Sequence, residues 1–142
     1  MSILVTGGAG YIGSHMVHAL VDRGESVVVL DNLSTGYDAV IPGAATLVVG
    51  DIGDGDLVDK LLADHGITAV AHFAGSIVVP DSVTDPLSYY ENNTVKSRSL
   101  IAAAVRGKVK AFLFSSTAAV YGEPGVDLID EKVPLGPVSP YG

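Results

Sequence analysis

The chain has 142 residues, of which 48% are hydrophobic, and its mean hydropathy is +0.42. This length predicts a single domain, and the apolar fraction is enough for a packed core, which excludes a disordered chain. The formal net charge of -8 argues against a nucleic-acid surface, because phosphate backbones are bound by clusters of Lys and Arg that this sequence lacks.

Three features bear on where the protein works. The absence of cysteine excludes disulfides and thiolate metal sites and fits a reducing compartment. The N-terminus runs directly into an apolar strand without a basic leader, and apolar runs such as Val27 to Leu30 are far shorter than the roughly 20 residues of a membrane span. We therefore predict a cytoplasmic protein with no metal site and no membrane contact.

Segments typical of strands and helices alternate along the chain. Five apolar runs of strand length lie at residues 3–6, 26–30, 46–49, 68–73 and 111–114. Three segments with helical character lie at residues 11–23, 56–65 and 86–106, and each is followed by a glycine that would end it, Gly24, Gly66 and Gly107. The stretches 32–42 and 118–142 are predicted to be loops.

This alternation predicts an α/β fold. Continuous apolar strands separated by helices form a parallel sheet that is covered on both faces, and right-handed crossovers make it a doubly wound sheet of the Rossmann type. Ligands bind such sheets at the carboxyl ends of the strands. Because the sequence stops in a loop, we expect residues 1–142 to be an incomplete domain, truncated before its last strands, with the C-terminal substrate domain absent.

A glycine motif joins the first strand to the first helix. Gly7 would permit the sharp turn, Gly10 would let a pyrophosphate approach the backbone, and Gly13 would let the helix pack close to the sheet. The helix N-terminus offers free N–H groups and a partial positive charge, which suits phosphates even in an acidic protein. A lone glycine triplet is often only a tight turn, but the strand before it and the helix after it favour a dinucleotide site.

An acidic residue follows the second strand. Asp31 lies about 20 residues after the glycine motif, where a carboxylate would accept hydrogen bonds from the adenosine ribose; the alternative is a solvated loop carboxylate. A carboxylate also repels a 2′-phosphate, and the next residues offer no cation, so NAD is favoured over NADP. The motif and Asp31 together predict that the chain is an NAD-binding domain.

Residues after the third and fourth strands would lie at the same edge. Asp51 is predicted to contact the adenine amino group, although a turn leading into the next helix explains it nearly as well. The small residues of Phe73-Ala74-Gly75 would let the cofactor cross the edge of the sheet. His72 stands inside an apolar strand and is predicted to be a packed core residue, not a ligand.

The glycine spacing, G-x-x-G-x-x-G, resembles that of the extended short-chain dehydrogenase/reductase family. Further matches span essentially the whole chain: Asp31-Asn32-Leu33, Asp51-Ile52, His72-Phe73-Ala74-Gly75, Tyr89-Tyr90-Glu91-Asn92-Asn93, Ser115 to Gly122, and Ser139-Pro140-Tyr141-Gly142. Together with Ser76-Ile77-Val78-Val79-Pro80, this set resembles the bacterial UDP-glucose 4-epimerases of that family.

The resemblance implies a set of NAD contacts. The pyrophosphate would be held by Gly7, Gly10, Tyr11, Ile12 and Gly13. The adenosine would be lined by Asp31, Asn32, Leu33, Ser34, Thr35, Gly36, Asp51 and Ile52. The rest of the cofactor would be bordered by Phe73, Ala74, Gly75, Ser76, Ile77, Asn92 and Ser115. Many of these epimerases carry lysine where this chain has Ile77, so one cationic contact to a cofactor phosphate would be lost.

The resemblance also implies a chemistry for Tyr141 and Thr117, which would contact the sugar. An ionised tyrosine of a Tyr-x-x-x-Lys pair, here Tyr141, takes the proton of the 4-hydroxyl of a UDP-sugar while hydride passes from C4 to NAD. The 4-keto sugar then turns over in the pocket and takes the hydride back on its other face. Thr117 would bind the same sugar oxygen. The lysine of the pair would fall beyond Gly142, so we expect little or no turnover by these 142 residues.

Other chemistries of the family are disfavoured. Related 4,6-dehydratases place Asp and Glu just after the threonine, and related decarboxylases use Glu there, but this chain has Ala118 and Ala119, which cannot transfer a proton. The expected function is therefore interconversion of UDP-glucose and UDP-galactose in galactose metabolism. Two alternatives stay open: a non-catalytic NAD-binding module, and another NAD-dependent nucleotide-sugar epimerase.

The resemblance further implies a homodimer for the complete protein. Family members pair through a bundle formed by the helix predicted at residues 86–106 and the helix that carries the Tyr-x-x-x-Lys pair. Only the first is present here, so we expect an exposed apolar face and marginal stability or self-association.

Overall fold

The computed structural model describes residues 1–125 and 127–142. Its centre is a five-stranded sheet in the order β3-β2-β1-β4-β5, in which all neighbouring strands run parallel. The strands are β1 (Ser2–Thr6), β2 (Ser26–Asp31), β3 (Thr46–Val49), β4 (Ala69–His72) and β5 (Ala111–Phe114). The prediction of a Rossmann-type, doubly wound α/β fold is confirmed, and every predicted strand is present.

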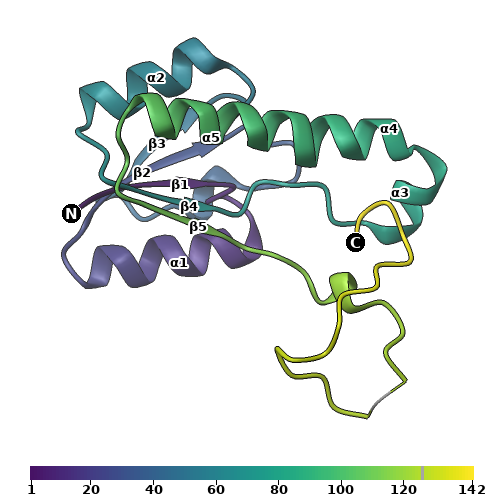
Figure 1. Ribbon diagram of the computed structural model, residues 1–142. Helices are drawn as coiled ribbons and strands as arrows, with labels where there is room; N and C mark the ends of the chain where they lie inside the picture. Colours follow the sequence, from purple (N-terminus) through teal and green to yellow (C-terminus); the bar gives the residue numbers. More distant parts are fainter. Residues whose placement is uncertain (126) are drawn as a thin grey trace.

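Helices cover both faces of the sheet. Helix α1 (Tyr11–Asp22) packs on one face, and α2 (Gly55–Asp64) and α5 (Lys96–Arg106) lie together on the other (Figure 1). Gly24 and Gly66 follow α1 and α2 with positive φ, which confirms them as helix stops. After α5 the residue with positive φ is Lys108 and not Gly107. Gly107 instead allows close packing of α5 on α2, because a Cβ there would lie 3.0 Å from the Leu62 side chain.

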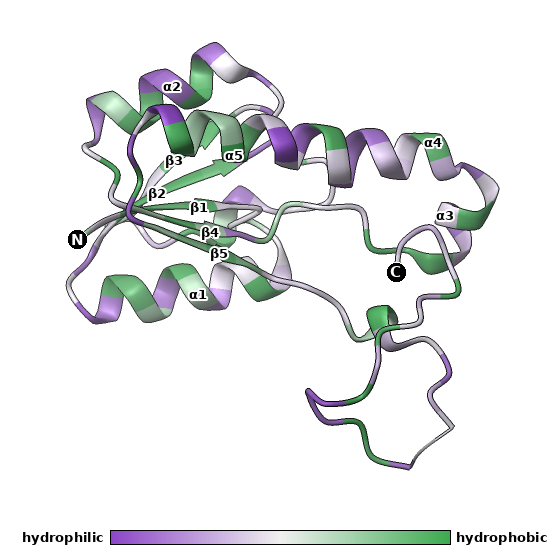
Figure 2. Cartoon of the chain, in the orientation of Figure 1, coloured by the Kyte–Doolittle hydropathy of each residue, from purple (hydrophilic) through white to green (hydrophobic). Residues whose placement is uncertain are grey.

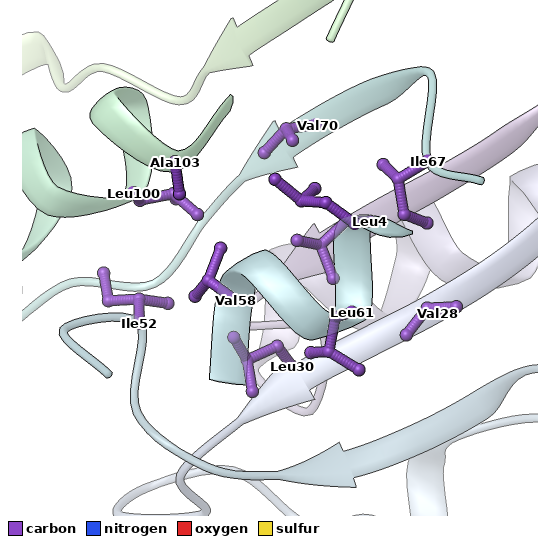
Figure 3. Packing of buried hydrophobic residues seen from close by; sticks show 11 residues of the cluster. Leu4, Val28, Leu30, Ile52, Val58, Leu61, Ile67, Val70, Leu100 and Ala103 are labelled. Atoms are coloured by element: carbon purple, nitrogen blue, oxygen red, sulfur yellow. The ribbon is translucent and has the colours of Figure 1, made fainter. Parts of the chain in front are cut away.

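Two apolar layers flank the sheet, because successive strand residues point to opposite faces. Leu4, Leu30 and Val70 point toward α2 and α5, where they pack with Val58, Leu61 and Leu100, among others (Figure 3). Residues of the alternate register, such as Val5 and Val29, pack against Val17 on α1. Both faces of the inner strands β1, β2 and β4 are buried, so these strands are apolar along most of their length and not alternating (Figure 2).

The predicted helix at residues 86–106 contains three consecutive parts. They are α4 (Pro86–Tyr89), a π-helical segment η2 (Tyr90–Val95) and α5, and they form one continuous rod (Figure 1). Asp85 caps the rod, since its side chain accepts a hydrogen bond from the Ser88 N–H at 3.2 Å.

Three short helices were not predicted. These are α3 (Val79–Thr84) and the 3-10 turns η1 (Asp38–Val40) and η3 (Ala118–Tyr121), the last two inside segments predicted to be loops. In the described part of the chain, no helix has the length and apolar character to cross a membrane.

His72 is a core residue, as predicted. Its side chain is 1% exposed, with Nδ1 2.6 Å from the Thr6 hydroxyl and Nε2 2.8 Å from the Ser97 hydroxyl. The rings of Phe112 and Phe114 lie beside it, with centroids at 6.0 and 5.7 Å. Burial lowers the pKa of His72 from 6.5 to about 4, so the imidazole is neutral at pH 7 and ties β1, β4 and α5 together.

The burial of His72 predicts a pH-dependent stability. The unfolded chain binds a proton at this residue below pH 6.5, whereas the folded chain does so only near pH 4. The free energy of unfolding should therefore fall by about 2 kcal/mol between pH 7.5 and pH 5 because of this residue. Urea unfolding of His72→Phe at both pH values should show that part of the pH dependence gone, along with a lower stability at pH 7.5 from the two hydroxyls left unpaired.

The matched control is His65→Phe, which replaces an exposed histidine at the end of α2 and should leave the pH dependence due to His72 in place. An unchanged pH dependence in His72→Phe would contradict the assignment.

Candidate dinucleotide site

The strand order reverses between β1 and β4, and ligands of doubly wound sheets bind where loops diverge at such a point. The loop after β1 carries the glycine motif, and the loop after β4 carries residues 73–77 (Figure 1). The carboxyl ends of β2 and β3, with Asp31 and Asp51, lie at the same edge of the sheet. The predicted cofactor segments therefore follow the carboxyl ends of strands. Asn92 is the exception, because it lies in the π-helical segment beside the β4 loop.

The three glycines of the motif differ in the structural reason for which each must be glycine. Gly7 has a φ of +70°, and a Cβ there would lie 2.5 Å from the Ala74 backbone nitrogen. A Cβ at Gly13 would lie 2.1 Å from the Gly7 carbonyl oxygen, so the turn and the helix touch backbone to backbone. Gly10 has an ordinary φ of -80°, and a Cβ there would meet only the Gly7 oxygen at 3.3 Å. The fold thus requires Gly7 and Gly13, while the open side of Gly10 is free for a ligand.

The N-terminus of α1 has the properties of an anion site. Its N-cap is Gly10, which has no side chain to cap the helix, and the first turn carries no acidic residue. Tyr11 and Ile12 are exposed, and the first-turn N–H groups have no partner within the helix. The helix dipole adds partial positive charge at the same place.

Asp31 is buried, and the alternative of a solvated loop carboxylate is wrong. Its side chain is 8% exposed, Oδ2 accepts a hydrogen bond from the Ala9 N–H at 2.9 Å, and Oδ1 accepts one from the Leu33 N–H at 2.8 Å. These bonds hold the glycine loop against the end of β2. Each carboxylate oxygen keeps a further acceptor site, so the side chain can also receive ribose hydroxyls.

The segment after Asp31 folds over the glycine loop. The Tyr37 N–H donates to the Ala9 carbonyl at 3.1 Å, and a Cβ at Gly36 would lie 2.7 Å from the Ala9 Cβ. Three residues between Asp31 and Gly36 are exposed: Asn32, Ser34 and Thr35. The structure thus brings the predicted adenosine segment, residues 31–36, directly beside the predicted pyrophosphate segment.

Asp51 sits in a small polar cluster. Its Oδ1 accepts a hydrogen bond from the Gly53 N–H at 2.8 Å, and its Oδ2 lies 2.6 Å from the Lys96 ammonium. Partial burial acts to raise the pKa of Asp51, but the Lys96 hydrogen bond and charge, with the Gly53 N–H, outweigh burial and hold it below its ordinary value. The neighbouring Ile52 packs its side chain into the core (Figure 3).

The loop after β4 is held by two asparagines of the π-helical segment. Asn93 accepts from the Ser76 N–H at 2.7 Å and donates to the Ser76 carbonyl at 2.8 Å, while Asn92 donates to the Ser76 hydroxyl at 2.9 Å. Ile77, beyond the clamp, is exposed. Asn93 belongs to one of the matching motifs, but its role was not predicted, because the helical period does not predict that two adjacent residues reach one loop.

Two segments meet around the predicted catalytic residues. Thr117 caps η3 by accepting the Ala119 N–H at 3.1 Å, and a Cβ at Gly142 would lie 2.6 Å from the Ala119 carbonyl oxygen. The Gly136 N–H also donates to the Val120 carbonyl at 2.9 Å. The turn of Thr117 and the segment of Tyr141 are therefore packed together.

Tyr141 is also anchored to α3 and α4. Its ring meets that of Tyr89 edge to face with centroids 6.4 Å apart, and its N–H donates to the Ser82 hydroxyl at 3.3 Å. Ser115, at the other end of the segment, donates its N–H to the His72 carbonyl at 3.1 Å and so continues the pairing of β5 with β4.

The reversal of strand order, the open glycine loop and the acidic residue at the end of β2 define a dinucleotide-binding α/β protein. The model of the NAD dependent epimerase/dehydratase family matches residues 3–142. The chain belongs to this family.

Individual relatives are close. The UDP-glucose 4-epimerase of Azospirillum brasilense is 54% identical over 140 residues, which are 99% of this chain and 40% of that protein. A crystal structure of a UDP-glucose 4-epimerase is 46% identical and superposes with a TM-score of 0.96 over 99% of this chain and 43% of its own. The Brucella ovis enzyme in complex with NAD is 39% identical with a TM-score of 0.94, again over 99% and 43%. The chain thus spans about two fifths of the length of these relatives.

The asparagine clamp predicts a local effect. Asn93→Ala removes both bonds to the Ser76 backbone, so hydrogen exchange of the Ser76 amide should accelerate roughly tenfold or more. The matched control is Asn92→Ala, which removes only a bond to the Ser76 hydroxyl and a long contact to Asn93. Equal exchange rates in the two variants, measured by mass spectrometry or NMR, would show that Asn93 does not hold this loop.

Proposed function

We propose that this chain is the cofactor-binding part of an NAD-dependent UDP-sugar 4-epimerase acting on UDP-glucose and UDP-galactose. The observation that carries the proposal is the glycine cradle, in which Gly10 has an ordinary φ and a Cβ there would have only one atom, the Gly7 carbonyl oxygen at a tight 3.3 Å, within 4 Å, so the rest of that side is open to a ligand. A glycine at such a position is explained by the close approach of a pyrophosphate to the backbone. The identity to UDP-glucose 4-epimerases across the whole chain supports the same assignment.

The remaining polar groups of the crevice fit the two halves of NAD. The N–H groups of the first turn of α1 face the pyrophosphate, and Asp31 accepts the adenosine ribose hydroxyls with its free lone pairs. Because Asp31 is buried and negatively charged, a 2′-phosphate in its place would be repelled, which favours NAD over NADP. Asp51 accepts a hydrogen bond from the amino group of adenine, while Asn92 and Ser115 border the nicotinamide half.

The sugar chemistry falls to Thr117 and Tyr141. Bound NAD supplies an oxidant that takes hydride from C4 of the sugar and returns it. Tyr141 takes the proton of the 4-hydroxyl, and its ring is held for this by Tyr89. Since the Thr117 oxygen already accepts the Ala119 N–H, its own hydrogen is available to the sugar oxygen. Ala118 and Ala119 offer no proton-transfer group, which disfavours elimination of water.

We further propose that the complete protein is a cytoplasmic homodimer that pairs through the rod from α4 to α5. Leu87, Tyr90, Ile101 and Val105 are exposed along this rod, and an apolar surface of this kind is typical of an interface. The cysteine-free composition fits the proposed compartment.

Calorimetric titration with NAD and with NADP tests the proposed cofactor site. The chain should bind NAD at least tenfold more tightly than NADP, a difference of about 1.4 kcal/mol. Asp31→Asn keeps an acceptor for the Ala9 N–H but removes the charge, so the preference should shrink toward unity. The control is Asp38→Asn, which removes an exposed charge from η1 and should leave the preference unchanged. Failure of a chain with a folded circular-dichroism spectrum to bind either dinucleotide would refute the proposal.

A further inference from the structure

Lys96 and Asp51 form an unusually sheltered ion pair. Their side chains are 26% and 35% exposed, whereas those of Lys60 and Asp64 are 71% and 53% exposed, at the same separation of 2.6 Å. The Lys60 pair lies within a single helix, but Lys96 begins α5 and reaches the loop after β3, 45 positions away in sequence. Exposed pairs contribute little to stability, whereas this partly buried pair joins two separate elements at the edge of the sheet where ligands of doubly wound folds bind.

The pair fixes the direction of one carboxylate. Asp51 Oδ1 is held by the Gly53 N–H, and Oδ2 is held by Lys96 and, at 3.5 Å, by the amide of Asn32. The stem of Lys96 crosses the same turn, because a Cβ at Gly53 would lie only 3.1 Å from the Lys96 Cγ. Three donors from three places in the fold therefore meet on Asp51, and its remaining lone pairs keep a single orientation.

We propose that Lys96 is a positioning residue that sets selectivity for adenine by holding Asp51 as a fixed hydrogen-bond acceptor. The inference rests on the proposed function, in which Asp51 meets the amino group of adenine. An ionised carboxylate can only accept hydrogen bonds, so it pairs with the amino group of adenine and opposes the oxygen that hypoxanthine carries at the same ring position. Without Lys96 the Asp51 carboxylate turns toward solvent, and its repulsion of the hypoxanthine oxygen weakens.

The geometry also explains why the residue is a lysine. The ammonium must reach across the turn at Gly53 from the first residue of α5, and a flexible four-carbon stem covers that distance while its apolar part packs on the turn. The partial neutralisation of Asp51 by Lys96 also reduces the repulsion between Asp51 and an anionic dinucleotide.

The test is a titration of this chain with NAD and with nicotinamide hypoxanthine dinucleotide. The unmodified chain should prefer NAD by roughly tenfold or more, the usual value of one base-edge contact. Lys96→Met keeps the length of the stem and removes the charge, and should lower this preference at least threefold. Lys96→Arg should restore most of it. Lys96→Gln provides a second neutral variant if the methionine variant does not fold.

Lys60→Met is the matched control, because it removes a lysine from an equally short but exposed ion pair and should leave the preference unchanged. If Lys96→Met bound both dinucleotides more weakly but kept the same ratio of the two affinities, the inference would be overturned. Lys96 would then support the structure of the site without setting its selectivity for adenine. A rise in the preference would also overturn it, because Lys96 would then contact the base itself. Failure of the unmodified chain to bind NAD would refute the proposed function as well, whereas binding with an unchanged ratio refutes only the role of Lys96.

Discussion

Close backbone contact at Gly7 is the constraint on which the rest of the site depends. The end of β1, the start of α1 and the loop after β4 meet there at distances that admit no Cβ, with Gly13 against the Gly7 carbonyl and Gly7 against Ala74. This contact places the N-terminus of α1 at the edge of the sheet where the strand order reverses. A larger residue at Gly7 or Gly13 would move the helix and its N–H groups away from that crevice, so the same atoms determine both packing and binding.

The electrostatics of the chain follow from this arrangement. A protein with a net charge of -8 has few cationic side chains for a dianionic ligand, and the phosphate site proposed here uses the backbone N–H groups at the start of α1 instead. The carboxylates gather at the adenosine end. Asp31 is offset by two backbone N–H donors, and Asp51 by Lys96. Each negative charge at the proposed site is therefore compensated locally, which reduces its repulsion of an anionic ligand.

Much of the fold was predictable from the sequence, because strand-length apolar runs and helical spacing are local properties. All five strands and the helices α1 and α2 were placed within one or two residues, and α5 lies inside the helix predicted at residues 86–106 and ends where that helix was predicted to end. The π-helical segment was not predictable in this way, since no apolar period marks it. Asn93 and Lys96 were missed for a related reason: their partners are distant in sequence, and the π-helical turn determines which side of the rod they face. The difference between Gly10 and its neighbours likewise depends on distances that only the folded chain defines.

The two halves of the proposed site rest on different kinds of support. The cofactor half is built on strand ends and a helix terminus that are fixed by the buried layers on both faces of the sheet. Thr117 and Tyr141 instead lie on a Gly- and Pro-rich segment, whose described hydrogen bonds to the rest of the chain join the Ser115 N–H to the His72 carbonyl and the Tyr141 N–H to the Ser82 hydroxyl, beside the ring contact of Tyr141 with Tyr89. Loops on a rigid scaffold tolerate change, and function in common folds varies at such loops. Residues around Ala118 and Ala119 can therefore change without disturbing the contacts of the glycine loop, because the two segments depend on separate sets of contacts.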